Sequence, residues 1–172
     1  KCLVFGKADS GKTRFVYEYA NSLLTELTDG ICLIIARKSK TERKLVESDK
    51  YTCLNRIFYK WATDIISLIQ IGSRMHLFKD QELELLVIED ILEFVSPFQV
   101  NAIMHFFINS ISVFPTCRLI VTMTPKKEAN IYNFRLPMTF FVNTFNDSIN
   151  IGVFPKNIAK TEKEIHDYLK QD

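Results

Sequence analysis

The stretch GKADSGKT, residues 6–13, lies between a short apolar run and an amphipathic segment. It fits the pattern G-x-x-x-x-G-K-[ST], in which glycines let backbone N–H groups close around phosphate oxygens. The helix expected after it points its positive end at the same place. The loop consists of Gly6, Lys7, Ala8, Asp9, Ser10, Gly11, Lys12 and Thr13. The pattern predicts a strand, a phosphate-binding loop and a helix in succession, and with them an α/β fold.

Lys12 and Thr13 carry the chemistry expected of a nucleoside triphosphate site. We expect the Lys12 ammonium to reach the β- and γ-phosphates and the Thr13 hydroxyl to ligate Mg²⁺. The alternative is a chance match, which a chain of this length with average composition produces on the order of once in a hundred or less. No N-K-x-D guanine motif occurs in the chain. The sequence therefore predicts that ATP and Mg²⁺ are the cofactors.

The second element expected of such a site is a strand that ends in an acid, and the stretch LELLVIEDILEF, residues 83–94, supplies it. Here the apolar run Leu85–Ile88 ends on Glu89 and Asp90, and an acid at this place holds the Mg²⁺ shell. Either carboxylate suits the role, and the alternative is a pair of solvated acids at a strand end. The catalytic candidates are therefore Lys12, Glu89 and Asp90, and the metal candidates are Thr13, Glu89 and Asp90.

A group that orients or deprotonates an attacking water is harder to find. The strand-like run Ile31–Ala36 leads into basic residues, including Arg37 and Lys38, rather than into a glutamate. The run LIVTMT, residues 119–124, offers Thr122 and Thr124 rather than glutamine or asparagine. Asp90 is the one obvious acid near the expected nucleotide that is left for this role. Because hydrolysis needs such a group, we expect ATP binding with weak or absent turnover.

Apolar runs and chain breakers alternate along the chain, which indicates a parallel sheet covered by helices on both faces. The expected strands are Leu3–Phe5, Ile31–Ala36, Asn55–Trp61, Leu85–Ile88 and Leu119–Thr122, with an antiparallel hairpin of Thr139–Phe145 and Ile149–Phe154. The expected helices are Thr13–Leu27, Asp64–Ile71 and Phe98–Phe114, with a capping box at Thr161 and Glu164 opening another. We expect one domain over residues 1–172. Because the chain begins on a strand without Met, we also expect further N-terminal residues in the full protein.

Composition places the chain among ordinary globular proteins, with 47% hydrophobic residues, 24% charged residues and a net charge of +2. No apolar run reaches the roughly 18 residues of a membrane span. The four cysteines include no C-x-x-C pair, and this favours free thiols in a cytosolic or nuclear protein.

In the order of these segments the chain resembles a RecA/RadA-type recombinase core. The phosphate loop on the first strand, LLVIED as the acid-ending strand, LIVTMT as the sensor-like strand and the terminal hairpin carry the resemblance. It is most similar to the short, divergent paralogues of Shu-type complexes, which work beside a SWIM-domain protein. The segment IIARKSK, residues 34–40, is similar to the arginine-containing segment that they carry where active recombinases place a catalytic glutamate.

The resemblance implies an ATP-binding protein of homologous recombination and DNA repair in the nucleus. Its implied partners are a recombinase paralogue or SWIM-domain protein, recombinase filaments and single-stranded DNA. Glu89 takes the acidic-strand role, and Thr124 lies where the family has a γ-phosphate-sensing glutamine. The family's second DNA-binding loop would hold Lys126, Lys127 and Arg135.

Basic residues that follow strands lie on the carboxyl rim of an open sheet, where ligands bind. Arg37, Lys38, Lys126 and Lys127 are therefore candidates for contact with a DNA backbone, and solvated surface lysines are the alternative. The helix at 98–114 is apolar on more than one side, so we expect either burial on both sides or a partner interface.

Two other functions compete with the recombinase-paralogue reading. In an active AAA+ or signalling-type ATPase, Glu89 and Asp90 would work as a metal and base pair, although no helical lid domain follows. A small-molecule kinase would need an arginine-rich lid over its acceptor, for which the basic segment after Ala36 is a poor substitute.

Overall fold

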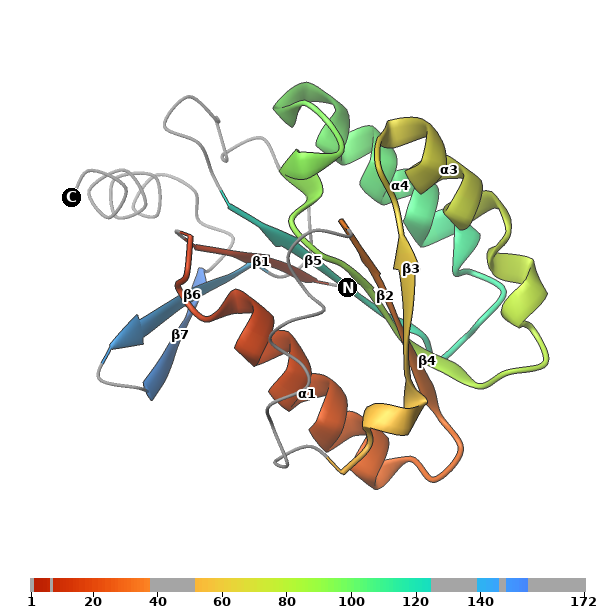
Figure 1. The fold of residues 1–172 in the computed structure, drawn as a ribbon, viewed down its shortest axis with the longest axis horizontal. Helices are drawn as coiled ribbons and strands as arrows, with labels where there is room; N and C mark the ends of the chain where they lie inside the picture. The colour runs from red at the N-terminus through yellow and green to blue at the C-terminus, as the bar shows by residue number, and fades with distance from the viewer. Residues whose placement is uncertain (1, 7, 38–51, 125–138, 146–147, 155–172) are drawn as a thin grey trace.

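Seven strands form one sheet in the computed structural model, which describes residues 2–6, 8–37, 52–124, 139–145 and 148–154 (Figure 1). The strands are β1 (Cys2–Phe5), β2 (Ile31–Ala36), β3 (Ile57–Trp61), β4 (Leu83–Ile88), β5 (Arg118–Met123), β6 (Thr139–Phe145) and β7 (Ser148–Phe154). The α-helices are α1 (Lys12–Glu26), α3 (Ile65–Ser73) and α4 (Val100–Ser110). Short 3₁₀ turns are η1 (Leu54–Arg56), η2 (Met75–Phe78), η3 (Ile91–Glu93) and η4 (Pro97–Gln99).

The strand order is β3-β2-β4-β5-β1-β6-β7. All pairs among strands β1 to β6 are parallel, and β7 returns antiparallel to β6. In register, Val4 of β1 lies between Thr122 of β5 and Phe140 of β6. This confirms the expected α/β fold with a mainly parallel sheet and a C-terminal antiparallel hairpin, a layout compatible with Rossmann-like and RecA-like proteins.

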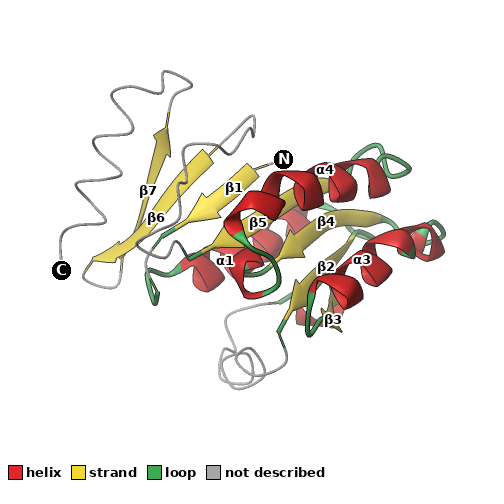
Figure 2. Ribbon diagram, turned by 90° about the horizontal axis from the view of Figure 1, so that it is seen from above, coloured by secondary structure: helices red, strands yellow, loops and turns green. Residues whose placement is uncertain are grey.

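Helix α1 covers one face of the sheet, while α3 and α4 cover the other (Figures 1 and 2). All six residues of β2 are buried because both faces of the strand meet a helical layer. Residues of β2 alternate between the two cores: Leu33 and Ile35 face α3 and α4, while Cys32 and Ile34 face α1. Continuous burial explains why the strand sequence is apolar throughout rather than alternating.

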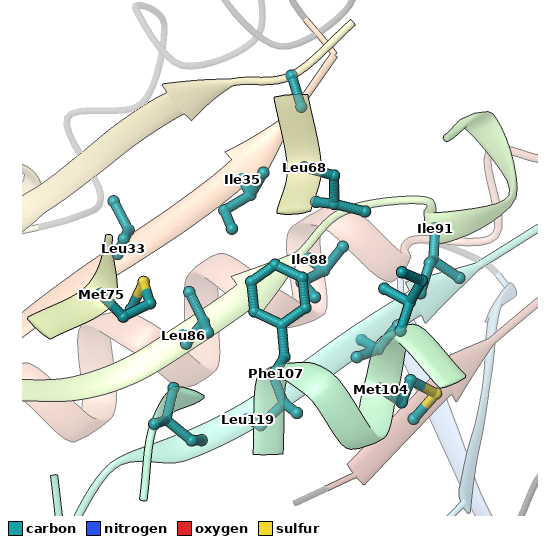
Figure 3. Packing of buried hydrophobic residues seen from close by; sticks show 14 of the residues in the cluster. Leu33, Ile35, Leu68, Met75, Leu86, Ile88, Ile91, Met104, Phe107 and Leu119 are labelled. Carbon is teal, nitrogen blue, oxygen red and sulfur yellow. The ribbon is translucent and has the colours of Figure 1, made fainter. Parts of the chain in front are cut away.

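The larger core lies under α3 and α4, with the fully buried ring of Phe107 at its centre (Figure 3). The expected apolar stripe of the helix at 98–114 is buried, as Val100, Ile103, Met104, Phe107 and Ile111. Phe106 and Ile108, which lie off the stripe, are half-buried against the same core. Packing within the chain therefore accounts for most of the helix's second apolar side, and the partner interface stays a prediction.

Local side-chain contacts move several element boundaries from their expected places. The Arg56 guanidinium donates to the carbonyls of Leu24, Leu27 and Thr28 at the end of α1, which holds residues 54–56 as a 3₁₀ turn before β3. A capping box of Ser96 with Gln99 and a proline at position 97 likewise form η4, so that α4 begins at Val100. The predicted C-terminal helix lies outside the described residues.

Candidate functional site

The phosphate-loop segment connects the end of β1 to the first turn of α1. Asp9 and Gly11 both have positive φ, 58° and 87°, and α1 begins at Lys12 directly after Gly11. Glycine adopts this backbone conformation without the steric cost that a Cβ brings. The Gly6 N–H donates to the Met123 carbonyl at 3.3 Å, which ties the loop's first residue to β5. Lys7 lies outside the described residues.

The Lys12 ammonium is folded back into the loop. Its Nζ donates to the Gly6 carbonyl at 2.9 Å, and the residue is 8% exposed. Burial lowers the pKa of Lys12, while the negative charges of Asp90, Asp9 and Glu89 act against that shift. A desolvated cation beside the first turn of a helix is a donor suited to phosphate oxygens.

Ser10 adds a second donor to the loop. The residue is 4% exposed, and its Oγ has no hydrogen-bond partner among the described residues. Buried hydroxyl groups are nearly always satisfied in folded proteins, by protein groups, water or ligands. A phosphate oxygen at the loop would supply a partner, so the residues present fit an ATP phosphate group.

Thr13 connects the loop to the acid-ending strand. Its hydroxyl donates a 2.7 Å hydrogen bond to Oε1 of Glu89, and the backbone N–H of Glu89 donates to the Ile35 carbonyl at 2.8 Å. Leu85 and Val87 of β4 face α1, so strand alternation places Glu89 on that face as well. A hydroxyl and a carboxylate at this distance are oxygen donors of the kind that Mg²⁺ selects.

Asp90 has different neighbours from Glu89, although the two are consecutive. Its N–H donates to Oγ1 of Thr122 at 2.8 Å, and its carboxylate accepts from the N–H and the hydroxyl of Thr124 at 2.9 and 2.8 Å. The structure therefore brings Thr13 of the loop, Glu89, Asp90 and the end of β5 together.

Arg37 lies at the same end of the sheet but points elsewhere. Its side chain is exposed, and NH1 lies 3.5 Å from the Glu93 carbonyl in η3. Strand alternation after Ile35 also puts Arg37 on the side of α3 and α4, away from Thr13. The other candidates for DNA contact, Lys38, Lys126 and Lys127, lie outside the described residues.

Two residues near the site were not assigned a role from the sequence. Thr122 is 1% exposed and its hydroxyl oxygen accepts the Asp90 N–H. The sequence signal that could have identified it was a hydroxyl directly after the apolar run Leu119–Val121. Tyr59 of β3 has a buried hydroxyl without a partner among the described residues, and burial and the charge of Glu89 raise its pKa. Its ring stacks on Trp61 with centroids 5.4 Å apart.

Comparisons of the chain with models of known protein families and with curated protein sequences found no match. Within the described part of the chain, no group of three or more His, Cys, Asp and Glu residues converges as a metal site. This finding does not concern a Mg²⁺ ion held by Thr13, Glu89 and phosphate oxygens, because Glu89 would be its one ligand among these four residue types. None of the helices in the described ranges has the length and apolar character that crossing a membrane requires.

Proposed function

We propose that this chain is a P-loop protein with a RecA-like core that binds ATP and Mg²⁺ and hydrolyses ATP weakly or not at all. The observation that carries the proposal is the 2.7 Å hydrogen bond from Thr13 to Glu89. It joins the residue that ends the loop motif to the acid that ends β4, and these are the two protein groups that such a site needs around its metal.

The donors of the loop support the same function. Lys12 and Ser10 are buried beside the first turn of α1, and Gly11 gives the chain the positive φ that leads into that turn. When bound, Mg²⁺ would neutralise charge between the β- and γ-phosphates. Lys12 would exchange the Gly6 carbonyl for a phosphate oxygen, and Thr13 and Glu89 would hold the metal side.

Weak turnover follows from what surrounds the site. Arg37 follows β2 where a glutamate would be useful, and it reaches toward Glu93 instead. Thr124 uses both its N–H and its hydroxyl on Asp90. Neither side chain is placed to deprotonate a water beside the phosphates, which supports weak turnover and a role of the bound nucleotide in assembly.

Within the recombinase-paralogue resemblance, the chain would act in homologous recombination and DNA repair in the nucleus. It would work in a complex with a recombinase paralogue or SWIM-domain protein, on recombinase filaments and single-stranded DNA. Strand order supports the resemblance because β5, the sensor-like strand, lies between the loop strand β1 and the acid-ending strand β4.

The direct test is nucleotide binding by the full chain. We expect Mg²⁺–ATP binding that Lys12→Ala removes and that Lys60→Ala, a change at an exposed lysine of β3, leaves intact. Equal binding by both variants would contradict the proposal. Steady-state turnover of about 1 s⁻¹ or faster would favour an active AAA+ or signalling-type ATPase instead. Affinity purification with mass spectrometry then tests the partners, because a recombinase, a paralogue or a SWIM-domain protein is expected among them.

A further inference from the structure

The two consecutive acids after β4 make contacts of different kinds. Glu89 accepts the Thr13 hydroxyl, whereas Asp90 accepts the N–H and the hydroxyl of Thr124. We propose that Asp90 is a positioning residue that joins the carboxyl ends of β4 and β5, and that Glu89 alone is the acid on the metal side of the site. This division of roles rests on the proposed nucleotide site.

The backbone at Asp90 supports the positioning role. Its φ of 48° lies in the left-handed region, which costs most L-residues energy and which Asp and Asn tolerate best. The N–H of Asp90 donates to Thr122 at 2.8 Å, and Thr122 is a buried residue of β5. The turn after β4 is therefore fixed through its backbone by one threonine and through its carboxylate by another.

The same contacts determine what Thr124 can offer a phosphate. Thr124 has one backbone N–H and one hydroxyl hydrogen, and both point to the Asp90 carboxylate. Only acceptor lone pairs remain on its hydroxyl. Because phosphate oxygens need donors, Thr124 does not sense a γ-phosphate while its pair with Asp90 is closed.

The joined strand ends also hold Glu89 in place. The Glu89 N–H donates to Ile35 on β2, and the next N–H, that of Asp90, donates to Thr122 on β5. The two peptide units that flank the Glu89 Cα are thus held by the strands on either side of β4, one by β2 and the other by β5. This fixed backbone directs the Glu89 side chain toward Thr13, and a hydrogen-bond network of this kind, here partly buried, gives a metal ligand its orientation.

The first experiment measures how much Mg²⁺ tightens the binding of a fluorescent ATP analogue, by comparing Kd with Mg²⁺ and with EDTA. Glu89→Gln should abolish the gain from Mg²⁺. Asp90→Asn should keep the gain within about threefold of the unmodified chain, because Asn tolerates the left-handed backbone and still accepts the Thr124 N–H. If Asp90→Asn abolishes the gain as fully as Glu89→Gln does, Asp90 is a metal ligand and the proposal is overturned.

The second experiment needs no nucleotide. Asp90→Ala and Thr124→Val should each lower Tm by about 2–4 °C, and the double variant should lose less than the sum, because both changes break the same hydrogen bond. Additive losses would show that the pair does not hold the strands together. If the unmodified chain binds no ATP analogue under either condition, the proposed function and the role of Glu89 both fail, while the Tm cycle still decides the role of Asp90.

Discussion

Gly72 of α3 lies directly against the ring of Phe106 on α4. A Cβ built on Gly72 would come within 2.3 Å of Phe106 Cε1 and 3.0 Å of Phe107 Cε1. Phe107 is fully buried and meets the half-buried Phe106 ring edge to face, with ring centroids 5.3 Å apart, so an added Cβ would force the Phe106 ring to shift. The glycine therefore sets how closely the two helices approach over the sheet.

The first prediction concerns this contact. Gly72→Ala should destabilise the chain by about 1–3 kcal/mol through overpacking, although alanine alone favours a helix by about 1 kcal/mol. Chemical denaturation measures whether Gly72→Ala lowers or raises the free energy of unfolding. Gln70→Ala, at an exposed position of the same helix, is the matched control and should be neutral or stabilising. A stabilised Gly72→Ala variant would contradict the close approach of the helices.

The second prediction concerns the N-cap of α3. Asp64 accepts the Ser67 N–H at 2.8 Å, and this backbone hydrogen bond, followed by the Ser67 hydroxyl, lowers the pKa of Asp64. A carboxyl whose pKa is lower in the folded state contributes stability above its unfolded pKa, and loses it as pH falls through the folded value. The stabilisation is therefore fully present above about pH 5 and is lost progressively as the pH falls through the unfolded and then the lower folded pKa.

The measurement compares Tm of the unmodified chain with that of Asp64→Asn and Asp64→Ala. Asn also caps helices but does not titrate, so the advantage of Asp over Asn should shrink between about pH 5 and about pH 2. Asp64→Ala should be less stable than both at neutral pH. A pH-independent difference in Tm between the Asp and Asn chains would show that the charge of Asp64 does not contribute to this cap.

The third prediction concerns Lys12. Burial lowers its pKa from the ordinary value of 10.5, so the ammonium of the free protein loses its proton at a lower pH than a surface lysine does. Bound phosphates favour the charged form, and affinity for ATP should fall as pH rises through the lowered pKa of the free protein. Lys12→Arg provides the control because guanidinium stays charged. Its affinity, whatever its absolute value, should not show this fall, and two parallel pH curves would assign the titration to another group.

The fourth prediction concerns Lys126 and Lys127, which lie outside the described residues. If they contact a DNA backbone, Lys126→Glu with Lys127→Glu should weaken single-stranded DNA binding by the partnered complex, and reduce its salt dependence by about 0.7 per lost phosphate contact. The matched control is Arg74→Glu with Lys79→Glu, which changes the net charge by the same amount at exposed positions between α3 and β4. If the variant of Lys126 and Lys127 binds single-stranded DNA with unchanged affinity at low salt, these residues do not contact the DNA.

Local patterns predicted the parts of this chain that local chemistry determines. The loop motif, the apolar strands and the helix after the loop need only neighbouring residues, and the structure has α1 within one residue of its expected range at each end. Burial of β2 on both faces also followed from its unbroken apolar sequence.

What the sequence could not supply depends on which strands are neighbours. Nothing local to Asp90 indicates that Thr122 and Thr124 lie beside it, because that contact exists only once β4 and β5 pair in the register of Ile88 with Val121. The choice between Glu89 and Asp90 stayed open for the same reason. Likewise, β3 begins at Ile57 rather than at Asn55, because the Arg56 side chain reaches carbonyls at the end of α1, far away in the sequence.

The position of β1 has a consequence for how the chain folds during synthesis. Leu3 pairs with Val121 of β5 on one side and with Thr139 of β6 on the other, so β1 has no neighbour from the first half of the chain. Among the strands of this sheet β1 is synthesised before the others, and its pairing with β5 cannot form until β5 has left the ribosome. Pairings of this sequence separation are slow to form. Until then the Gly6–Thr13 loop lacks the strand contact at Met123 that holds it, and ligand affinity would arise late in synthesis, as the sheet closes around β1.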